Sequence, residues 1–448
     1  MPSFVQSFGS FSATLHGVIV SSILVAGMLV SLLGGILADR YGRPRMIALG
    51  SLIFGIGAAV ETTSVTLAMF IIGRLIKGVG EGIFLMTVYV LVAEISPAKR
   101  RGTVTNITQI MISSGIVSGY LICSLSWRLP LALQATVALI NAAACSLVPQ
   151  SPRWLLMKGL TEQARHTIAQ LGIAAEEQEE LFRQAVAGIE HSPDLSFFDS
   201  VKETLHGFKD AFAAPVRGRT IFGCFILAMQ QYSGIDGLLY YAPTIFRQAG
   251  LRSTQASFFA SGISALVMLI ITVPATLMCD MWGRTTSSLV GGSLTFFLML
   301  LIGSLYAAGK VDAHHGVARW VVIVSVYLWA CVFSATWALG LRMYLIESLP
   351  RKTRSSGASL AQASNWLANY TVALTTPVFL ASSSFGAYYF FAFMTLFCTI
   401  MCAFFMIETK GHSLEYIEQR FTDRQSNAKS ILRRRRLGGQ NFALRNVQ

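Results

Sequence analysis

The sequence predicts an all-α, polytopic membrane protein built from two related helical bundles. Three observations support this fold class: the composition, the recurrence of long apolar segments, and an internal repeat of charged motifs. Of the 448 residues, 53% are hydrophobic and 13% are charged, whereas a soluble globular chain carries about 25% charged residues. This composition disfavours a soluble enzyme, a nucleic-acid-binding protein and a disulfide-stabilised secreted scaffold.

Eleven apolar segments are long enough to cross a hydrocarbon core of about 30 Å as helices. They are residues 14–38, 46–66, 68–92, 103–125, 129–148, 219–240, 256–279, 287–308, 318–346, 356–380 and 385–406. The polar stretch that separates the first five from the last six predicts amphipathic helices at 161–171 and 174–189. We therefore expect an amino-terminal bundle (1–148), a cytoplasmic linker (149–217), a carboxy-terminal bundle (218–406) and a basic cytoplasmic tail (407–448).

The positions of Lys and Arg predict which loops face the cytoplasm. The net charge is +13, and the basic residues gather in alternate loops. The richer loops, which the positive-inside rule assigns to the cytoplasm, hold Arg40, Arg43, Arg45, Lys99, Arg100, Arg101, Arg284, Arg351, Lys352 and Arg354. The opposite loops hold Arg128, Arg247, Arg252, Lys310 and Arg319. The seven cysteines show no metal-ligand spacing and are interpreted as small packing residues.

Two charged motifs recur in the same order in both halves of the chain. Asp39-Arg40-x-Gly42-Arg43 follows the first apolar segment, and Asp280-Met281-Trp282-Gly283-Arg284 follows the seventh. Two segments later in each half, a glutamate precedes an arginine by seven residues, as Glu94 and Arg101 and as Glu347 and Arg354. The repetition indicates two related halves, a transporter design in which the ligand site lies between them.

These motifs resemble those of the sugar porters of the major facilitator superfamily, in a fungal-like form, over about residues 14–421. The marks are Ala38-Asp39-Arg40-Tyr41-Gly42-Arg43, Gly73-Arg74, Glu94-Ile95-Ser96-Pro97, Gln150-Ser151-Pro152-Arg153-Trp154-Leu155, Gln230-Gln231, Tyr240-Tyr241, Asn365-Trp366 and Glu408-Thr409-Lys410-Gly411. The resemblance implies a major facilitator fold of two six-helix bundles. Because eleven spans are counted, the first transmembrane helix of the usual twelve is expected to be missing.

Neutral amide side chains within the apolar segments are the candidate sugar ligands. A polyol needs donors and acceptors that replace its bonds to water without adding a desolvated charge. Five amides meet this need: Gln109, Gln230, Gln231, Asn365 and Asn369. Amides also link transmembrane helices to one another, which is the alternative interpretation.

The resemblance implies more specific roles at these segments. It implies sugar contacts for Gln109, Gln230, Gln231 and Asn365. It further implies a cavity-lining aromatic at Trp366 and outer-gate tyrosines at Tyr240 and Tyr241.

Two charges depart from the family pattern at positions that the resemblance implies face the sugar. Asp236 replaces an asparagine, and Arg342 replaces a tryptophan. A lone charge at mid-membrane costs about 2.5–3.5 kcal/mol on insertion scales, so a mutual ion pair is one expectation. The alternative is that Arg342 snorkels to the cytoplasmic interface. A pair would act as a structural lock, a proton site, or an anion site in which a substrate carboxylate displaces Asp236.

A second charged group, formed by Arg74, Lys77 and Glu81, shares one face of the third segment, since the spacings are three, four and seven residues. Ionisable residues inside a membrane indicate a functional site by default. We interpret the group as a candidate proton or charge relay. The alternative is a simple pair between Lys77 and Glu81 on one helix.

The repeated motifs predict a cytoplasmic salt-bridge network. Its expected members are Asp39, Arg40, Arg43, Glu94, Arg101, Asp280, Arg284, Glu347 and Arg354. The resemblance implies that these charges form bridges between the bundles and lock the outward-open state. The alternative is that they are separate, solvated charges at helix ends.

Together these features predict a multi-pass transporter, not an enzyme, in the plasma membrane. It is expected to move a monosaccharide or related polyol by alternating access, as a facilitator or a secondary active carrier, with proton coupling left open. The expected partners are the sugar, protons if coupled, and the lipid bilayer, for a monomer without cofactor, metal or nucleic acid. Two alternatives remain: a carrier of anionic sugar acids or quinate-like substrates, and a non-transporting sensor or truncated copy.

Overall fold

The computed structural model describes residues 2–96, 101–123, 126–172, 179, 182, 197–214, 216–251, 253–278, 281–311, 316–350, 353–410, 416–421 and 423. Every regular element in this part of the chain is a helix, which confirms the predicted all-α class. The elements of the first half and the linker are α1 (Pro2–Phe8), α2 (Ala13–Tyr41), α3 (Arg43–Thr63), α4 (Leu67–Ile95), α5 (Arg101–Cys123), α6 (Arg128–Ala144), the 3₁₀ helix η2 (Cys145–Leu147), α7 (Pro152–Met157), α8 (Thr161–Leu171) and α10 (Phe197–Ala211).

The second half contains eight helices within the described ranges. They are α11 (Arg217–Tyr232), α12 (Ile235–Gln248), α13 (Thr254–Met278), α14 (Arg284–Ala307), α15 (Ala318–Ala335), α16 (Trp337–Ser348), α17 (Arg354–Ser382) and α18 (Gly386–Phe405).

Nine helical stretches of the described chain are long and apolar enough to cross a membrane. They correspond to nine of the eleven predicted segments, and α15 and α16 together form one of them. The other two predicted segments are helical but differ from the rest. Residues 219–240 are divided between α11 and α12, and residues 356–380 lie within α17, whose many Ser, Thr and amide side chains lower its hydropathy.

The predicted segment 219–240 is interrupted at Gly234. The φ angle of Gly234 is +92°, in the left-handed region that a side-chain-bearing residue adopts only with strain. A Cβ at this position would also lie 2.7 Å from the ring of Phe391. The chain therefore ends α11 and starts α12 between Gln231 and Asp236, two of the predicted site residues.

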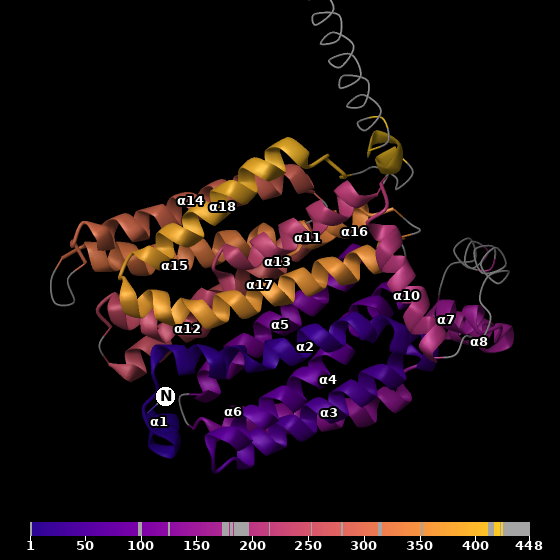
Figure 1. Ribbon diagram of the computed structural model, residues 1–448, viewed down its shortest axis with the longest axis horizontal. Coiled ribbons are helices and arrows are strands. Elements are labelled where there is room, and N and C mark those ends of the chain that lie inside the picture. Colours follow the sequence, from indigo (N-terminus) through magenta and orange to yellow (C-terminus); the bar gives the residue numbers. More distant parts are fainter. Residues whose placement is uncertain are drawn as a thin grey trace, which may run out of the picture.

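The two halves of the chain lie side by side with their long helices roughly parallel (Figure 1). Helices α2 to α6 lie together, and α11 to α18 form the other side. Two helix pairs, α2 with α17 and α5 with α13, pack across the boundary between the halves. The largest buried cluster belongs to the second half and includes Trp329, Trp337 and Tyr344. The boundary between the halves is therefore where side chains from both can meet.

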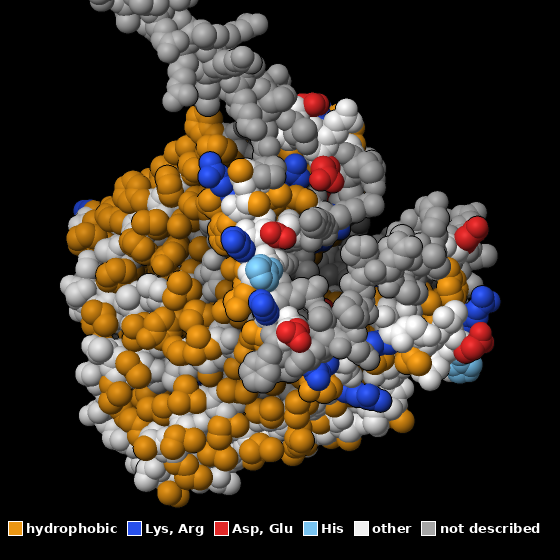
Figure 2. Space-filling model, turned by 45° about the vertical axis from the view of Figure 1, so that its right-hand side comes forward, with side chains coloured by type: hydrophobic (Ala, Val, Ile, Leu, Met, Phe, Trp, Pro, Cys, Tyr) orange, Lys and Arg blue, Asp and Glu red, His pale blue; other side chains and the backbone are white. Residues whose placement is uncertain are grey.

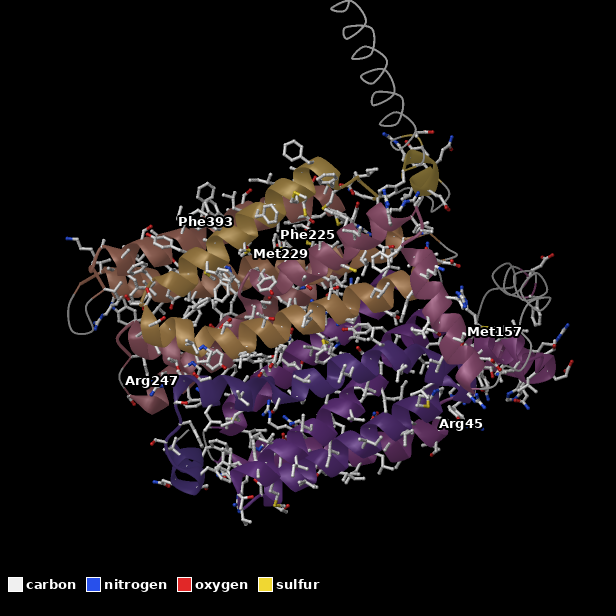
Figure 3. All side chains as sticks on the ribbon, in the orientation of Figure 1. Arg45, Met157, Phe225, Met229, Arg247 and Phe393 are labelled. Atoms are coloured by element: carbon white, nitrogen blue, oxygen red, sulfur yellow. The ribbon has the colours of Figure 1, made fainter. Side chains whose placement is uncertain are left out.

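The linker helices mark one end of the molecule. Helix α8 has the bounds predicted from the sequence, whereas α7 and α10 were not predicted; apart from Glu179 and Phe182, the helix expected at 174–189 lies outside the described residues. Charged side chains gather at this end, and hydrophobic side chains cover the flank (Figure 2). Arg45 lies at this end and Arg247 at the opposite one (Figure 3), as the positive-inside assignment of their loops requires.

Candidate functional site

Four amide side chains lie where the break between α11 and α12 faces α17: Gln230, Gln231, Asn365 and Asn369. Gln230 Nε2 donates to the Trp337 carbonyl at 2.8 Å, and Gln231 Nε2 donates to Asn365 Oδ1 at 3.2 Å. Asn365 Nδ2 donates to the Leu227 carbonyl at 2.8 Å. Asn365 Nδ2 also lies 3.5 Å from Gln230 Oε1, so both glutamines of α11 contact α17, and Gln230 contacts α16 as well; the amides form one cluster within the second half.

This amide cluster retains unused hydrogen-bonding capacity. Gln231 and Asn369 are 5% and 8% exposed. Gln231 Oε1 and Asn369 Oδ1 are buried and have no hydrogen-bond partner among the described residues. Buried polar atoms are almost always paired, because an unpaired one loses its bonds to water without compensation. Such atoms can accept hydrogen bonds from the hydroxyl groups of a ligand.

The other predicted sugar and gate residues occupy different surroundings. Gln109 lies on α5 and makes no hydrogen bond within the described chain. Trp366 is 5% exposed and belongs to a buried cluster with Leu24 of α2. Tyr241 is 2% exposed and donates to the Ala373 carbonyl at 2.8 Å, whereas Tyr240 is 40% exposed. Of the two predicted gate tyrosines, Tyr241 thus has a structural hydrogen bond inside the second half.

The ion pair expected between Asp236 and Arg342 is not formed in the structure. Asp236 Oδ2 accepts a hydrogen bond from Asn369 Nδ2 at 2.6 Å. Arg342 Nη1 donates to the Tyr89 hydroxyl at 3.1 Å, and its guanidinium lies 5.9 Å from the centre of that ring. Asp236 and Arg342 therefore each bind a different partner. Because Tyr89 lies on α4 and Arg342 on α16, their hydrogen bond crosses the boundary between the halves.

Lys77 pairs with Glu61 and not with Glu81, which corrects the expectation of a simple intrahelical pair. Lys77 Nζ lies 2.6 Å from Glu61 Oε2 and 3.2 Å from Gln134 Oε1. Glu61 on α3 is completely buried. Sequence analysis did not predict a role for Glu61. An acid inside the apolar segment 46–66 is the signal that could have revealed it.

The other two members of this charged group differ in their contacts. Arg74 Nη2 donates to the Val20 carbonyl at 3.0 Å, and its guanidinium lies 5.8 Å from the centre of the Phe70 ring. Glu81 has neither a hydrogen bond nor an ion pair within the described part of the chain. The relay group is therefore not a single network: Lys77 is neutralised by α3, while Glu81 keeps an unpaired carboxylate.

At the linker end, the first half contains a buried arginine with two acidic partners. Arg43 is 4% exposed and lies 2.7 Å from Asp39 Oδ1. Its Nε and Nη2 atoms meet the two oxygens of Glu94 at 3.1 and 3.2 Å. This two-point geometry is the strong form of an arginine–carboxylate contact. It joins the start of α3 to the ends of α2 and α4.

The second half has a corresponding arrangement around Arg284. Arg284 Nη2 lies 3.1 Å from Glu347 Oε1. Glu408 accepts hydrogen bonds from the backbone N–H groups of Arg284, Thr285 and Lys410 at 2.8, 3.0 and 3.0 Å. Burial would raise the pKa of Glu408, but its backbone hydrogen bonds hold it below the ordinary value. Glu408 was recognised as part of a motif but not as a member of this network.

The described ion pairs at this end each join helices of the same half, so the expected bridges between the bundles are not seen among them. Arg354 donates to the Leu349 carbonyl at 3.2 Å, and Arg40 lies 5.6 Å from the centre of the Tyr41 ring. Asp280 and the side chain of Arg101 lie outside the described residues. Arg43 and Arg284 therefore each bind a glutamate of their own half, at helix ends that the fold of that half holds close together.

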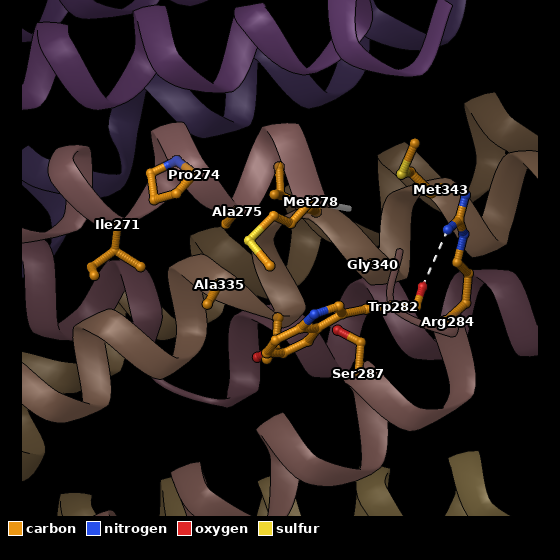
Figure 4. Close-up of a pocket in the computed structure, with 12 residues that line it drawn as sticks. Ile271, Pro274, Ala275, Met278, Trp282, Arg284, Ser287, Ala335, Gly340 and Met343 are labelled. Carbon is orange, nitrogen blue, oxygen red and sulfur yellow. Dashed lines mark hydrogen bonds between the residues drawn. The ribbon is translucent and has the colours of Figure 1, made fainter. Parts of the chain in front are cut away.

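A cavity of about 170 Å³ lies beside this second cluster (Figure 4). Its walls come from α13, α14, α15 and α16 and are mostly apolar, with Met278, Trp282 and Met343 among them. Arg284 Nη1 donates to the Trp282 carbonyl at 3.4 Å at its edge. The cavity is separate from the amide cluster, because none of the four amides lines it.

Comparison with known proteins identifies the family. The family of sugar (and other) transporters matches residues 3–421, so the chain belongs to this family. The high-affinity glucose transporter of Kluyveromyces lactis is 28% identical over 93% of this chain and 79% of its own length. The probable metabolite transport protein CsbC of Bacillus subtilis is 30% identical over 97% of this chain and 93% of its own.

A solved structure has the same fold. The proton:xylose symporter XylE from E. coli, of the major facilitator superfamily, superposes with a TM-score of 0.74 at 24% identity. The match covers 94% of this chain and 93% of XylE. The protein is therefore a multi-pass membrane transporter with the predicted major facilitator fold.

Proposed function

We propose that the chain moves a monosaccharide or a related polyol across the plasma membrane by alternating access, without chemical change of its cargo. The names of the relatives support a sugar as the cargo, since one of them is a glucose transporter. The chain would act as a monomer in the bilayer, as a facilitator or a secondary active carrier.

One observation carries the proposal: two oxygens of the amide cluster, Gln231 Oε1 and Asn369 Oδ1, are buried without a partner in the described structure. A sugar hydroxyl donates to an amide oxygen and accepts from an amide N–H group. Neutral amides bind a sugar hydroxyl without the desolvation cost of an added charge. Gln230 and Asn365 would hold these two residues in place, and Gln109 would approach from α5.

The proposed movement rocks the two halves about the cluster. Arg342 and Tyr89 form a hydrogen bond between α16 and α4, so this contact belongs to the part of the boundary that has to open. The Arg43 and Arg284 clusters each stabilise one half. We propose that they preserve the halves as rigid units during the movement.

The test is uptake of labelled glucose and xylose by transporter-deficient cells, with surface delivery of each variant measured. Replacement of Gln231 or Asn369 by leucine should lower uptake by about tenfold or more, the effect of about 1.4 kcal/mol of lost binding. A matched control is Asn141→Leu, because Asn141 is a helical amide that donates to Ser51 Oγ at 2.8 Å, away from the cluster. Equal uptake by all three variants would contradict the proposed site.

A second candidate cargo is an anionic sugar acid. Arg342 has its described hydrogen bond to a neutral tyrosine and no carboxylate within ion-pair distance in the described chain. A substrate carboxylate could therefore bind this guanidinium. Selective uptake of gluconate over glucose, abolished by Arg342→Gln, would favour this cargo over a neutral sugar.

A further inference from the structure

We propose that the apolar cavity of about 170 Å³ beside Arg284 is a lipid site, in which one hydrocarbon chain of a bilayer lipid lies between α13, α14 and α16. This site concerns the bilayer and not the cargo, so it goes beyond the proposed transport function. Three features of the molecule support it: the packed counterpart of the cavity in the first half, its open side, and its apolar wall.

The internal repeat assigns a counterpart in the first half to Ser287, a residue of the cavity wall. Ser287 follows the arginine of the second charged motif by three residues, and Met46 follows the arginine of the first motif by the same spacing. Met46 is 3% exposed and belongs to a packed hydrophobic cluster of the first half. Because serine has a much shorter side chain than methionine, the second half lacks the atoms that fill this space in the first.

A second wall residue, Thr336, has its counterpart in the same cluster. Thr336 precedes the repeated glutamate of the second half by eleven residues, and Ile83 precedes that of the first half by eleven. Ile83 and Met46 belong to one buried cluster. Both differences between the halves remove apolar side-chain volume from the second. A protein interior is normally packed as tightly as an organic crystal, so the unfilled space indicates a place for another molecule.

The cavity opens on the outer side of α13. Met278 and Trp282 of its wall are 42% and 46% exposed, whereas Leu339 on the α16 side is 4% exposed. Ile270 lies two turns before Met278 on the same face of α13 and is also exposed. Exposed apolar side chains of a membrane-spanning helix face the hydrocarbon of the bilayer. The cavity is therefore continuous with the surface that contacts lipid.

The chemistry of the wall favours hydrocarbon over water. Thr336 Oγ1 already donates to the Val332 carbonyl at 2.6 Å. Arg284 Nη2 lies 3.1 Å from Glu347 Oε1. An apolar cavity of about 150 Å³ stays dry and binds benzene, so this one accommodates a stretch of about six carbon atoms. An empty cavity would lose the dispersion contacts of its lining, and a chain that enters from the bilayer restores them.

An inserted chain contacts several helices of the second half at once. Ala275 and Met278 of α13 lie across the space from Ala335 and Ser287 (Figure 4). A chain between them keeps α13 apart from α16 next to the Arg284 cluster. Lipid therefore completes the packing of the second half at a place where the first half packs against itself.

The experiment is photolabelling of the purified full chain in vesicles. The vesicles consist of phosphatidylcholine with a small fraction of phosphatidylcholine that carries a diazirine in the middle of one chain, and peptide mass spectrometry locates the label. In the wild type, label should appear on the buried Leu339 as well as on the exposed Leu277. Ser287→Met, which introduces the residue of the first half, should lower the label on Leu339 several-fold and leave that on Leu277 unchanged.

The matched control is Val273→Phe. Val273 is exposed on the same helix and does not line the cavity, so this variant adds apolar volume on the lipid-facing surface alone. Both labels should stay as in the wild type. Ala275→Leu is a second filling variant, which reduces the space from the α13 side and should cause the same selective loss on Leu339 if Ser287→Met does not fold.

Three outcomes would overturn the lipid site. Wild-type label confined to exposed side chains would show that no chain enters. Equal label on Leu339 in the wild type and in a folded filling variant would show that the probe reaches this residue by another path. Label on Leu339 from a water-soluble diazirine would assign the space to water. Labelling does not require transport, so each of these results leaves the proposed function standing, and absence of sugar uptake leaves the lipid site standing.

Discussion

Lys77 and Glu61 form an ion pair inside the first half, with 2.6 Å between Nζ and Oε2 and Glu61 completely buried. The helices that carry them approach closely, because a Cβ on Gly57 of α3 would lie 2.5 Å from the backbone nitrogen of Lys77. Gln134 of α6 adds a second acceptor for Lys77 at 3.2 Å. One charge pair thus ties together three helices of the first half.

Removing one member of this pair should destabilise the protein more than removing both. Lys77→Met leaves Glu61 without its counterion in a buried site, at a cost on the order of 3–5 kcal/mol. The double variant Lys77→Met with Glu61→Leu should recover much of this loss, because no unpaired charge remains. Thermal unfolding in detergent measures the effect, and a single variant as stable as the wild type would show that the pair contributes little.

Arg43 should not tolerate lysine, because it contacts both oxygens of Glu94 as well as Asp39. Lysine cannot reproduce the planar two-point contact. We expect Arg43→Lys to lose about 1.5–3 kcal/mol of stability, the range for hydrogen bonds to charged groups, and to lower uptake. Arg45→Lys is the matched control, since Arg45 is exposed two residues further along the same helix. Similar melting temperatures for the two variants would argue against the Arg43 cluster as a stabilising element.

Glu408 should make stability depend on pH in the acid range. Its folded-state pKa lies below the ordinary value of 4.5. The stabilisation is therefore complete above the unfolded-state pKa and is lost as the pH falls through the lower, folded-state pKa. Melting curves of detergent-solubilised wild type and Glu408→Gln, recorded from neutral pH downward, should converge as the carboxylate becomes protonated. Parallel curves over this range would contradict the assignment.

Gly234 should be required for the break between α11 and α12. Alanine at a φ of +92° carries strain of about 1–3 kcal/mol, and its Cβ would collide with Phe391. We expect Gly234→Ala to reduce surface delivery and sugar uptake. Gly218→Ala is the control on the same helix, because a Cβ at Gly218 meets no atom within 4 Å. Equal delivery and uptake for the two variants would show that the break tolerates a side chain.

Local patterns in the sequence were sufficient for the helices and for the kinds of residue in the site. The apolar segments predicted α2 and α3 to within a few residues, and the amphipathic pattern at 161–171 predicted α8 at its observed bounds. Helix formation depends on residues near one another in the chain. Insertion into a membrane depends on the free energy of transfer of a segment to lipid, which its composition determines. The break at Gly234 was missed, because the apolar run continues through it.

The pairing of charges was decided by tertiary structure. Three acids, Glu61, Glu81 and Asp236, lie in the apolar segments. The sequence alone suggested Glu81 as the partner of Lys77 and Asp236 as the partner of Arg342. The fold instead brought Glu61 to Lys77 and Tyr89 to Arg342, across 16 and 253 residues. Which groups meet depends on how whole helices pack and rotate against one another. This is a property of the assembled bundles and not of any single segment. The sequence therefore determined which chemical groups enter the membrane, and the packing of the helices determined which of them are neutralised and which, like Glu81, are left unpaired.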